Sequence, residues 1–153
     1  MTNIILQKTI PSIVLKAWKL AKSTRLNAYA PYSHFLVGAA LKFCKDKNIY
    51  AGCNFENASY GATICAERNA LGSAIAHGAL KIANKSKKRD VLEFVIVVTN
   101  TTEATSPCGI CLQVLNEFAG PDTQVYLATN HAILQQAKFH QFLPSPFNEI
   151  EVL

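Results

Sequence analysis

Three cysteines and one glutamate have the types and spacing of a metal-dependent active site. Cys108 and Cys111 form a Cys-x-x-Cys pair, a pattern found in zinc sites and in thiol redox sites that also arises by chance. Upstream, Cys65 stands two residues before Glu67. Both groups lie at the predicted starts of helices, and the two N-termini meet if these helices lie side by side on one face of a sheet. Three cysteines gathered there would bind zinc and leave its fourth position open, as catalysis requires.

The chemistry of a helix N-terminus supports this interpretation. Unpaired N–H groups and partial positive charge at such an end favour a thiolate over a thiol. A structural four-cysteine site would need another close partner, but Cys44 and Cys53 lack the usual short ligand spacing. A thioredoxin-like redox pair at Cys108 and Cys111 remains the main alternative at this point.

Glu67 and Arg68 are the candidate supporting groups. Zinc lowers the pKa of a bound water, but a proton must still reach the substrate, and Glu67 could carry it without being a ligand. The alternative is an ordinary first-turn acid that stabilises the helix dipole. Three thiolates and one Zn²⁺ leave one excess negative charge, which an Arg68 guanidinium bonded to the sulfurs would offset. For Arg68 the alternative is a surface ion pair.

The apolar periodicity predicts an alternation of helices and strands. In chain order we expect a helix over 12–28, strands over 35–43 and 49–55, a helix over 65–78, a strand over 91–99, a helix over about 106–118 and a strand over 124–129. Ser12 and Ser106 are the expected N-caps, with Pro107 as the first residue of its helix. An early hairpin followed by strands that alternate with helices predicts a mixed sheet between helical layers.

Composition and charge indicate one globular domain over residues 1–153. Half of the chain is hydrophobic and 16% is charged, which argues against disorder. The net charge is +5, and much of the excess lies in a basic run formed by Lys81, Lys85, Lys87, Lys88 and Arg89. Because no aromatic residues are interleaved with these charges, we interpret the run as a solvated loop and expect no nucleic-acid partner.

The chain shows no signal peptide and no apolar window of the roughly 18 residues that a membrane span needs. Its five cysteines are an odd number, which argues against a disulfide framework. We therefore expect a soluble, cytoplasmic protein with no membrane partner.

The longer motifs resemble a known family. Cys65-Ala66-Glu67 followed by Pro107-Cys108-x-x-Cys111 is the signature of zinc deaminases that act on cytosine or adenine. The segments YSHFLVGAAL at 32–41, GCNFENASY at 52–60, CAER at 65–68 and SPCGIC at 106–111 resemble cytidine deaminases of the small homotetrameric class. The resemblance runs from about residue 29 to 118, with a weaker Leu-Pro-x-x-Phe match in the tail.

The resemblance implies an α/β fold, a three-layer α/β/α sandwich whose mixed sheet has about five strands. It also implies one Zn²⁺ per subunit and hydrolytic deamination of cytidine, and of 2′-deoxycytidine, to uridine or deoxyuridine and ammonia in pyrimidine salvage. In the mechanism that the resemblance implies, water attacks C4 of the base. Glu67 takes a proton from that water, passes it to N3 and later helps to protonate the departing amine.

Individual site roles also follow from the resemblance. Cys65, Cys108 and Cys111 would be the zinc ligands and Glu67 the catalytic residue. Asn54 and Glu56 would hold the ribose 3′-hydroxyl. The remaining substrate contacts would be Phe35, Ala66, Tyr60 and Phe147, the last two reaching a neighbouring subunit's site. Arg68 and Gln113 would support the site from behind.

One position departs from the family pattern, which usually has arginine directly after the last cysteine. Here that position holds Leu112, so charge neutralisation would depend on Arg68, unless the change affects packing alone. Other functions remain open at this stage. They are deamination of a modified nucleoside or of cytosine in a polynucleotide, a zinc-stabilised interaction protein without catalysis, and a thiol oxidoreductase.

Overall fold

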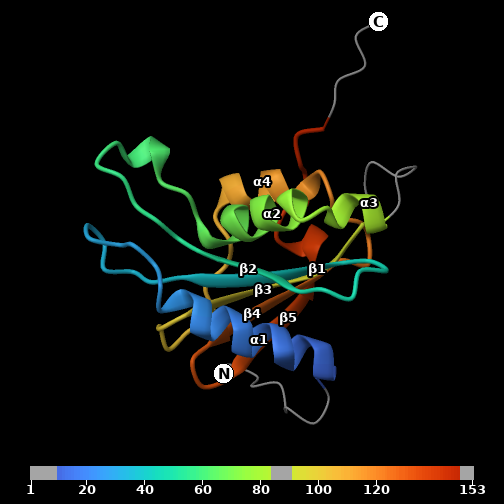
Figure 1. The fold of residues 1–153 in the computed structure, drawn as a ribbon, viewed down its shortest axis with the longest axis horizontal. Helices are drawn as coiled ribbons and strands as arrows, with labels where there is room; N and C mark the ends of the chain where they lie inside the picture. Colours follow the sequence, from blue (N-terminus) through green and yellow to red (C-terminus); the bar gives the residue numbers. More distant parts are fainter. Residues whose placement is uncertain (1–9, 84–90, 149–153) are drawn as a thin grey trace, which may run out of the picture.

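Five strands form one mixed sheet that lies between two layers of helices (Figure 1). The computed structural model describes residues 10–83 and 91–148. The strands are β1 Gly38–Phe43, β2 Tyr50–Cys53, β3 Leu92–Thr99, β4 Gln124–Thr129 and β5 Ile133–Lys138. The helices are α1 Ser12–Arg25 on one face of the sheet, and α2 Ala66–Ala76, α3 Ala79–Ala83 and α4 Gly109–Asn116 on the other. The predicted α/β/α sandwich is therefore confirmed.

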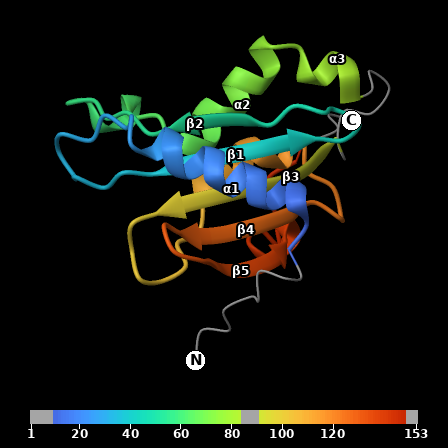
Figure 2. The ribbon, with the colours of Figure 1, turned by 60° about the horizontal axis from the view of Figure 1, so that its bottom comes forward.

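The strand order is β2-β1-β3-β4-β5, and Figure 2 shows these strands side by side with α1 crossing them. β1 is antiparallel to both β2 and β3, as expected for a hairpin, whereas β3 and β4 run parallel. The crossover between the parallel strands contains α4. The predicted combination of antiparallel and parallel pairing is confirmed.

β3 is the central element because its two faces supply two cores. Val95 and Val97 belong to the cluster shared with α2 and α4, whereas Phe94, Ile96 and Val98 belong to the cluster under α1. This double burial explains the unbroken apolar run in the sequence. On the α1 side, Trp18 is buried and its Nε1 donates a 2.8 Å hydrogen bond to the Thr129 carbonyl.

Several boundaries differ from the expected ones, and at two of them the backbone or a nearby side chain makes other contacts. α1 ends at Arg25 rather than at residue 28, and the Tyr29 N–H then donates to the Asn54 carbonyl while the Glu56 N–H donates to the Tyr29 carbonyl. Residues 35–37 precede β1 and are held by the Asn54 side chain. The proposed Ser12 cap is wrong, because Pro11 is the N-cap and no side chain caps this helix.

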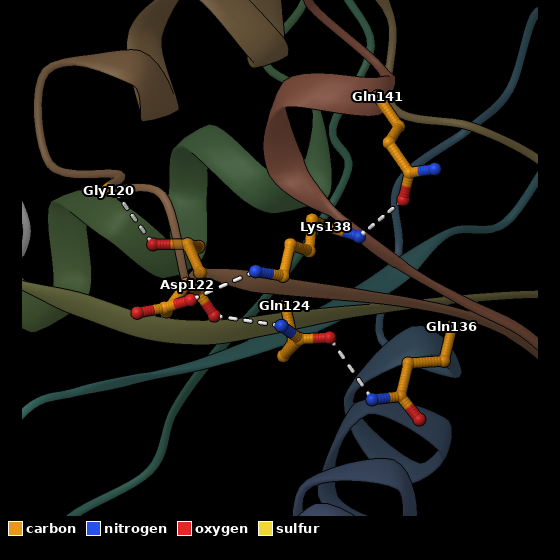
Figure 3. A network of polar contacts seen from close by, with 7 residues as sticks. Gly120, Asp122, Gln124, Gln136, Lys138 and Gln141 are labelled. Atoms are coloured by element: carbon orange, nitrogen blue, oxygen red, sulfur yellow. Dashed lines mark hydrogen bonds and ion pairs between the residues drawn. The ribbon is translucent and has the colours of Figure 1, made fainter.

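The sequence pattern missed β5 and α3. β5 is an edge strand whose Gln135 and Gln136 are exposed, so it lacks the apolar run of a buried strand. Polar contacts join it to the start of β4 and to the turn before that strand: Gln136 donates to Gln124, and Lys138 pairs with Asp122 at 3.0 Å (Figure 3).

Lys81 of the basic run lies in the short helix α3, so this part of the expected loop is helical. The other four members, Lys85, Lys87, Lys88 and Arg89, lie outside the described residues. In the described part of the chain, no helix combines the length and the apolar character that crossing a membrane requires.

Gly52 lets α2 lie directly on β2. A Cβ atom at Gly52 would stand 2.4 Å from the backbone N of Ala70 and 2.8 Å from the carbonyl oxygen of Ala66. Both neighbours are backbone atoms of α2, so they cannot move aside without moving the helix. This close approach fixes the height of the first turn of α2, which carries Glu67, above the sheet.

We expect Gly52→Ala to destabilise the fold by about 1–3 kcal/mol, because the added methyl must push α2 away from β2. The matched control is Gly72→Ala in the exposed face of the same helix, where a Cβ meets nothing within 4 Å. That change should be neutral or stabilise by about 0.5–1 kcal/mol. Denaturant unfolding of both variants measures the difference, and equal stabilities would contradict the role of Gly52.

Candidate active site

The N-termini of α2 and α4 meet on one face of the sheet, as the sequence predicted. Cys65 is the N-cap of α2 and Cys108 the N-cap of α4, and both have extended backbones, with ψ of 157° and 163°. Cys111 is buried in the first turn of α4. The expected start of this helix at Ser106 and Pro107 is wrong, because the chain stays extended through Cys108 and turns helical at Gly109.

The three sulfur atoms form a compact cluster. All lie within 4.8 Å of one another, and the Sγ atoms of Cys65 and Cys108 are 3.8 Å apart. A tetrahedral zinc with bonds of about 2.3 Å to sulfur places two ligand sulfurs roughly 3.8 Å apart. The donor set and its spacing therefore fit zinc bound by three thiolates, with the fourth position available.

The electrostatics of the cluster favour an ionised sulfur. A hydrogen bond from the Cys111 thiol, helped by Arg68, lowers the pKa of Cys65 to about 5. The same hydrogen bond and burial raise the pKa of Cys111, since that thiol keeps the shared proton. Zinc binding requires these protons to leave.

Glu67 is buried beside the cysteines, with only 4% of its surface exposed. Burial raises the pKa of its carboxyl to about 7. An acid that served only the helix dipole would lie in solvent, so this burial argues against the simpler interpretation. A carboxyl that is readily protonated and deprotonated near neutral pH is suited to carry a proton during a reaction.

A pocket of about 180 Å³ opens above Glu67. It contains five of the predicted groups in addition to two of the cysteines. The lining residues are Ser33, Phe35, Val37, Asn54, Glu56, Thr63, Cys65, Ala66, Glu67, Val97, Thr99, Thr105, Ser106 and Cys108. The structure thus brings Phe35, Asn54, Glu56, Ala66 and Glu67 of this chain together around one space.

Asn54 and Glu56 hold the loop at the pocket mouth. The Asn54 carboxamide oxygen accepts from the Val37 N–H at 2.8 Å, and its nitrogen donates to the Phe35 carbonyl at 2.9 Å. Glu56 accepts from the N–H groups of Tyr32 and Ser33 and from the Ser33 hydroxyl. These contacts position the pocket wall, and both side chains retain further hydrogen-bonding capacity.

Tyr60 and Phe147 do not line this pocket. Tyr60 is 77% exposed and packs edge-on against Tyr32 beside an adjacent hollow, while Phe147 is 70% exposed. The tail that carries Phe147 is held by Gln113, whose carboxamide donates to the Phe147 carbonyl at 2.7 Å and accepts from its N–H at 3.1 Å. Gln113 thus holds the tail rather than the metal ligands.

Arg68 lies beside the cysteine cluster, and Leu112 lies in the apolar core. Arg68 donates to the Thr63 carbonyl at 2.7 Å and lies 3.9 Å from the Cys65 sulfur, so it is not a surface ion pair. Leu112 is 6% exposed and packs in the core shared with α2. Where the family usually has arginine, Leu112 thus contributes apolar packing and no charge.

Thr99 and Thr105 are pocket residues that the sequence analysis missed. Their hydroxyls form a cluster with that of Thr101, in which the Thr99 and Thr101 oxygens are 2.6 Å apart. Thr99 ends β3, and ligands in open α/β sheets bind near the carboxyl ends of parallel strands. That position was the available signal.

Comparisons with known proteins agree with this geometry. Residues 12–128 match the family described as the cytidine and deoxycytidylate deaminase zinc-binding region. A cytidine deaminase of Halalkalibacterium halodurans is 43% identical over 129 residues, which are 84% of this chain and 89% of that protein. One of Sporosarcina psychrophila is 37% identical over 84% of this chain and 87% of its own.

Solved structures show the same likeness. The crystal structure of cytidine deaminase from Burkholderia pseudomallei has a TM-score of 0.75 and 37% identity, covering 90% of this chain and 100% of its own. That of Mycobacterium leprae has a TM-score of 0.69 and 32% identity, with 88% and 100% coverage. With a three-cysteine cluster and a buried glutamate at the matching motif, this chain belongs to the cytidine and deoxycytidylate deaminase family.

Proposed function

We propose that this protein is a zinc-dependent hydrolase that deaminates cytidine, and 2′-deoxycytidine, to uridine or deoxyuridine and ammonia. The observation that carries the proposal is the buried Glu67 carboxyl beside the three-cysteine cluster, at the base of a pocket that also contains Asn54 and Glu56. A redox pair would require neither the third cysteine nor the acid. We assign the reaction to pyrimidine salvage, since its substrate is a free nucleoside.

The residues divide the chemistry between two ends of the pocket. Bound by Cys65, Cys108 and Cys111, zinc would supply a Lewis acid that lowers the pKa of a water. Glu67 accepts one proton of the attacking water and delivers it to N3 of cytosine. It then takes the remaining proton from the new C4 hydroxyl and passes it to the departing amine, so that C4 becomes a carbonyl and ammonia leaves. Its raised pKa helps it to release the proton as readily as it accepts it.

At the other end of the pocket, Asn54 and Glu56 bind the ribose 3′-hydroxyl. The Glu56 carboxylate accepts a hydrogen bond from that hydroxyl, and the Asn54 amide can donate or accept. Phe35 packs against the nucleoside, and Ala66 contacts it from the first turn of α2. The two carboxylates are thus assigned different tasks, Glu67 in proton transfer and Glu56 in sugar recognition.

Arg68 offsets the charge of the thiolates. Its guanidinium is near the Cys65 sulfur and is anchored by the Thr63 carbonyl, and its buried Nε makes no hydrogen bond within the described residues. The position directly after Cys111, where the family usually has arginine, holds the buried Leu112 and so supplies no guanidinium. Arg68 therefore offsets the negative charge of the thiolates without the second arginine that the family usually has after the last cysteine.

We further propose a homotetramer whose sites are completed by neighbouring subunits. Tyr60 and Phe147 are exposed aromatic side chains that contribute nothing to the pocket of their own subunit. Exposed aromatic groups are typical of protein interfaces. None of the five cysteines, all of which lie in the described residues, forms a disulfide, which suits a reducing compartment and supports a cytoplasmic location.

The reaction itself is tested with Glu67→Gln, which removes the proton carrier but keeps the size of the side chain. We expect kcat for cytidine, followed by ultraviolet absorbance, to fall roughly 10²- to 10⁴-fold, while zinc content stays at the wild-type level. Glu117→Gln on the exposed end of α4 is the matched control. Full turnover by Glu67→Gln would contradict the role of Glu67, and inactive zinc-loaded wild type would contradict the substrate.

Arg68→Ala should weaken zinc binding or turnover by about 10- to 100-fold, the range usual for groups that support metal ligands. Arg68→Lys, which keeps the charge but loses the planar fork, should fall between this variant and the wild type. Zinc affinity is measured by competition with a chelator, alongside kcat. Unchanged affinity and turnover in Arg68→Ala would show that charge neutralisation does not depend on it.

Shared sites are tested by subunit mixing. Phe147→Ala should raise KM for cytidine, and Gln113→Ala should have the same effect because the tail is no longer held. The control is Gln136→Ala in the edge strand β5. In tetramers reassembled from both variants, a Phe147→Ala subunit supplies an intact Glu67 and a neighbouring Glu67→Gln subunit supplies an intact Phe147. Such mixed sites should regain a low KM for cytidine. Monomers in sedimentation, or no recovery on mixing, would refute the shared site.

A further inference from the structure

One hydroxyl, that of Ser33, connects two of the proposed nucleoside contacts. The Ser33 hydroxyl donates to Oε1 of Glu56. Oγ of Ser33 in turn accepts a 3.0 Å hydrogen bond from the Phe35 N–H. Ser33 lies in the segment YSHFLVGAAL, two residues before Phe35. Its hydroxyl spans the space between a carboxylate and an aromatic residue that both line the pocket.

The turn around Ser33 sets the orientation of the Glu56 carboxylate. Oε2 of Glu56 accepts from the Tyr32 N–H at 2.8 Å and from the Ser33 N–H at 3.1 Å. The Ser33 hydroxyl bonds to the other oxygen, so the two backbone donors and the hydroxyl hold the carboxylate from one side. These contacts, the Ser33 hydroxyl foremost, also lower the pKa of Glu56 and keep it ionised.

The position of Ser33 is itself held by the surrounding backbone. His34 follows it with φ of 56°, in the left-handed region, and the His34 N–H donates to the Ala30 carbonyl at 3.0 Å. On the far side, the Asn54 amide holds the Phe35 carbonyl. A hydroxyl on a turn anchored at both ends can orient its partners, because it does not adapt freely to them.

A carboxylate oxygen can accept two hydrogen bonds, so Oε1 of Glu56 retains one acceptor position beside Ser33. Ser33 and Glu56 line both the main pocket and the adjacent hollow of about 370 Å³. The remaining acceptor therefore lies at the mouth of the pocket, away from the proton transfer at Glu67.

We propose that Ser33 is a positioning residue for sugar recognition: its hydroxyl holds the Glu56 carboxylate in the orientation that accepts a hydrogen bond from the 3′-hydroxyl of the nucleoside. This role rests on the proposed function, since it presupposes that Glu56 binds the sugar. Ser33 takes no part in the chemistry at C4. Its loss should therefore change KM rather than kcat.

The test compares cytidine with 3′-deoxycytidine in the zinc-loaded protein. For Ser33→Ala we expect KM for cytidine to rise roughly tenfold, the loss typical of a hydrogen bond to a charged group, with kcat within about twofold of wild type. KM for 3′-deoxycytidine should change by less than about twofold, because that substrate cannot use the Glu56 acceptor. Ser33→Thr, which restores the hydroxyl, should bring KM for cytidine back toward wild type.

Two controls separate positioning from general damage. Ser23→Ala removes a hydroxyl that donates only within α1, to the Leu20 carbonyl, and should leave both substrates unaffected. Ser33→Ala introduced into a Glu56→Ala background should add nothing further for cytidine, since coupled residues are not additive.

The outcomes are distinct. Equal rises in KM for both nucleosides, or a fall in kcat alone, would overturn the proposal, since Ser33 would then act through Phe35 or the loop as a whole. Unchanged kinetics in Ser33→Ala would overturn it as well. A wild-type protein that turns over neither nucleoside would refute the proposed function instead, which is a different result from an active enzyme that is indifferent to Ser33.

Discussion

The convergence of two helix N-termini on one face of the sheet is the constraint on which the rest of this protein depends. α2 can bring Cys65 and Glu67 to that point only because Gly52 lets its backbone rest on β2. α4 reaches the same point through the crossover between the parallel strands β3 and β4. The apolar packing beneath both helices therefore positions the sulfur atoms and Glu67. Polar residues such as Asn54 and Glu56 complete the pocket.

The charge of the cluster is the second consequence of that arrangement. Three cysteines at helix ends gain from the partial positive charge there, but a three-thiolate zinc site still carries excess negative charge. Arg68 is close enough to reduce it, and Leu112 has become part of the apolar core. The proposed neutralisation would thus come from α2 alone, while α4 would supply two ligands and carries the apolar Leu112 directly after them.

Most helices and strands, and the two cysteine motifs, could be predicted because their signals are local, whereas the meeting of Cys65 with Cys108 and Cys111 followed only on the condition that their helices lie side by side. The apolar run of β3 and the cysteine spacing needed no tertiary information. β5 was missed because an exposed edge strand such as this one carries glutamines instead of an apolar run. The start of α4 was misplaced because Ser106 and Pro107 form a good capping pattern, and the extended backbone of Cys108 overrides it. Thr99 lines the pocket because it ends β3, and Thr105 lies in the chain that follows. The spacing of the two residues alone does not reveal this.

The separation of the ligands along the chain has a thermodynamic consequence. Cys65 and Cys108 are 43 residues apart, and their sulfurs approach each other only after β1, β3 and the two helices have assembled. An unfolded chain presents Cys108 and Cys111 as a pair but cannot add the third sulfur without closing a long loop. Zinc therefore prefers the native state, and its binding free energy becomes part of the stability of the fold. An ion bound by the three sulfurs would thus also link the N-termini of α2 and α4 on one face of the sheet.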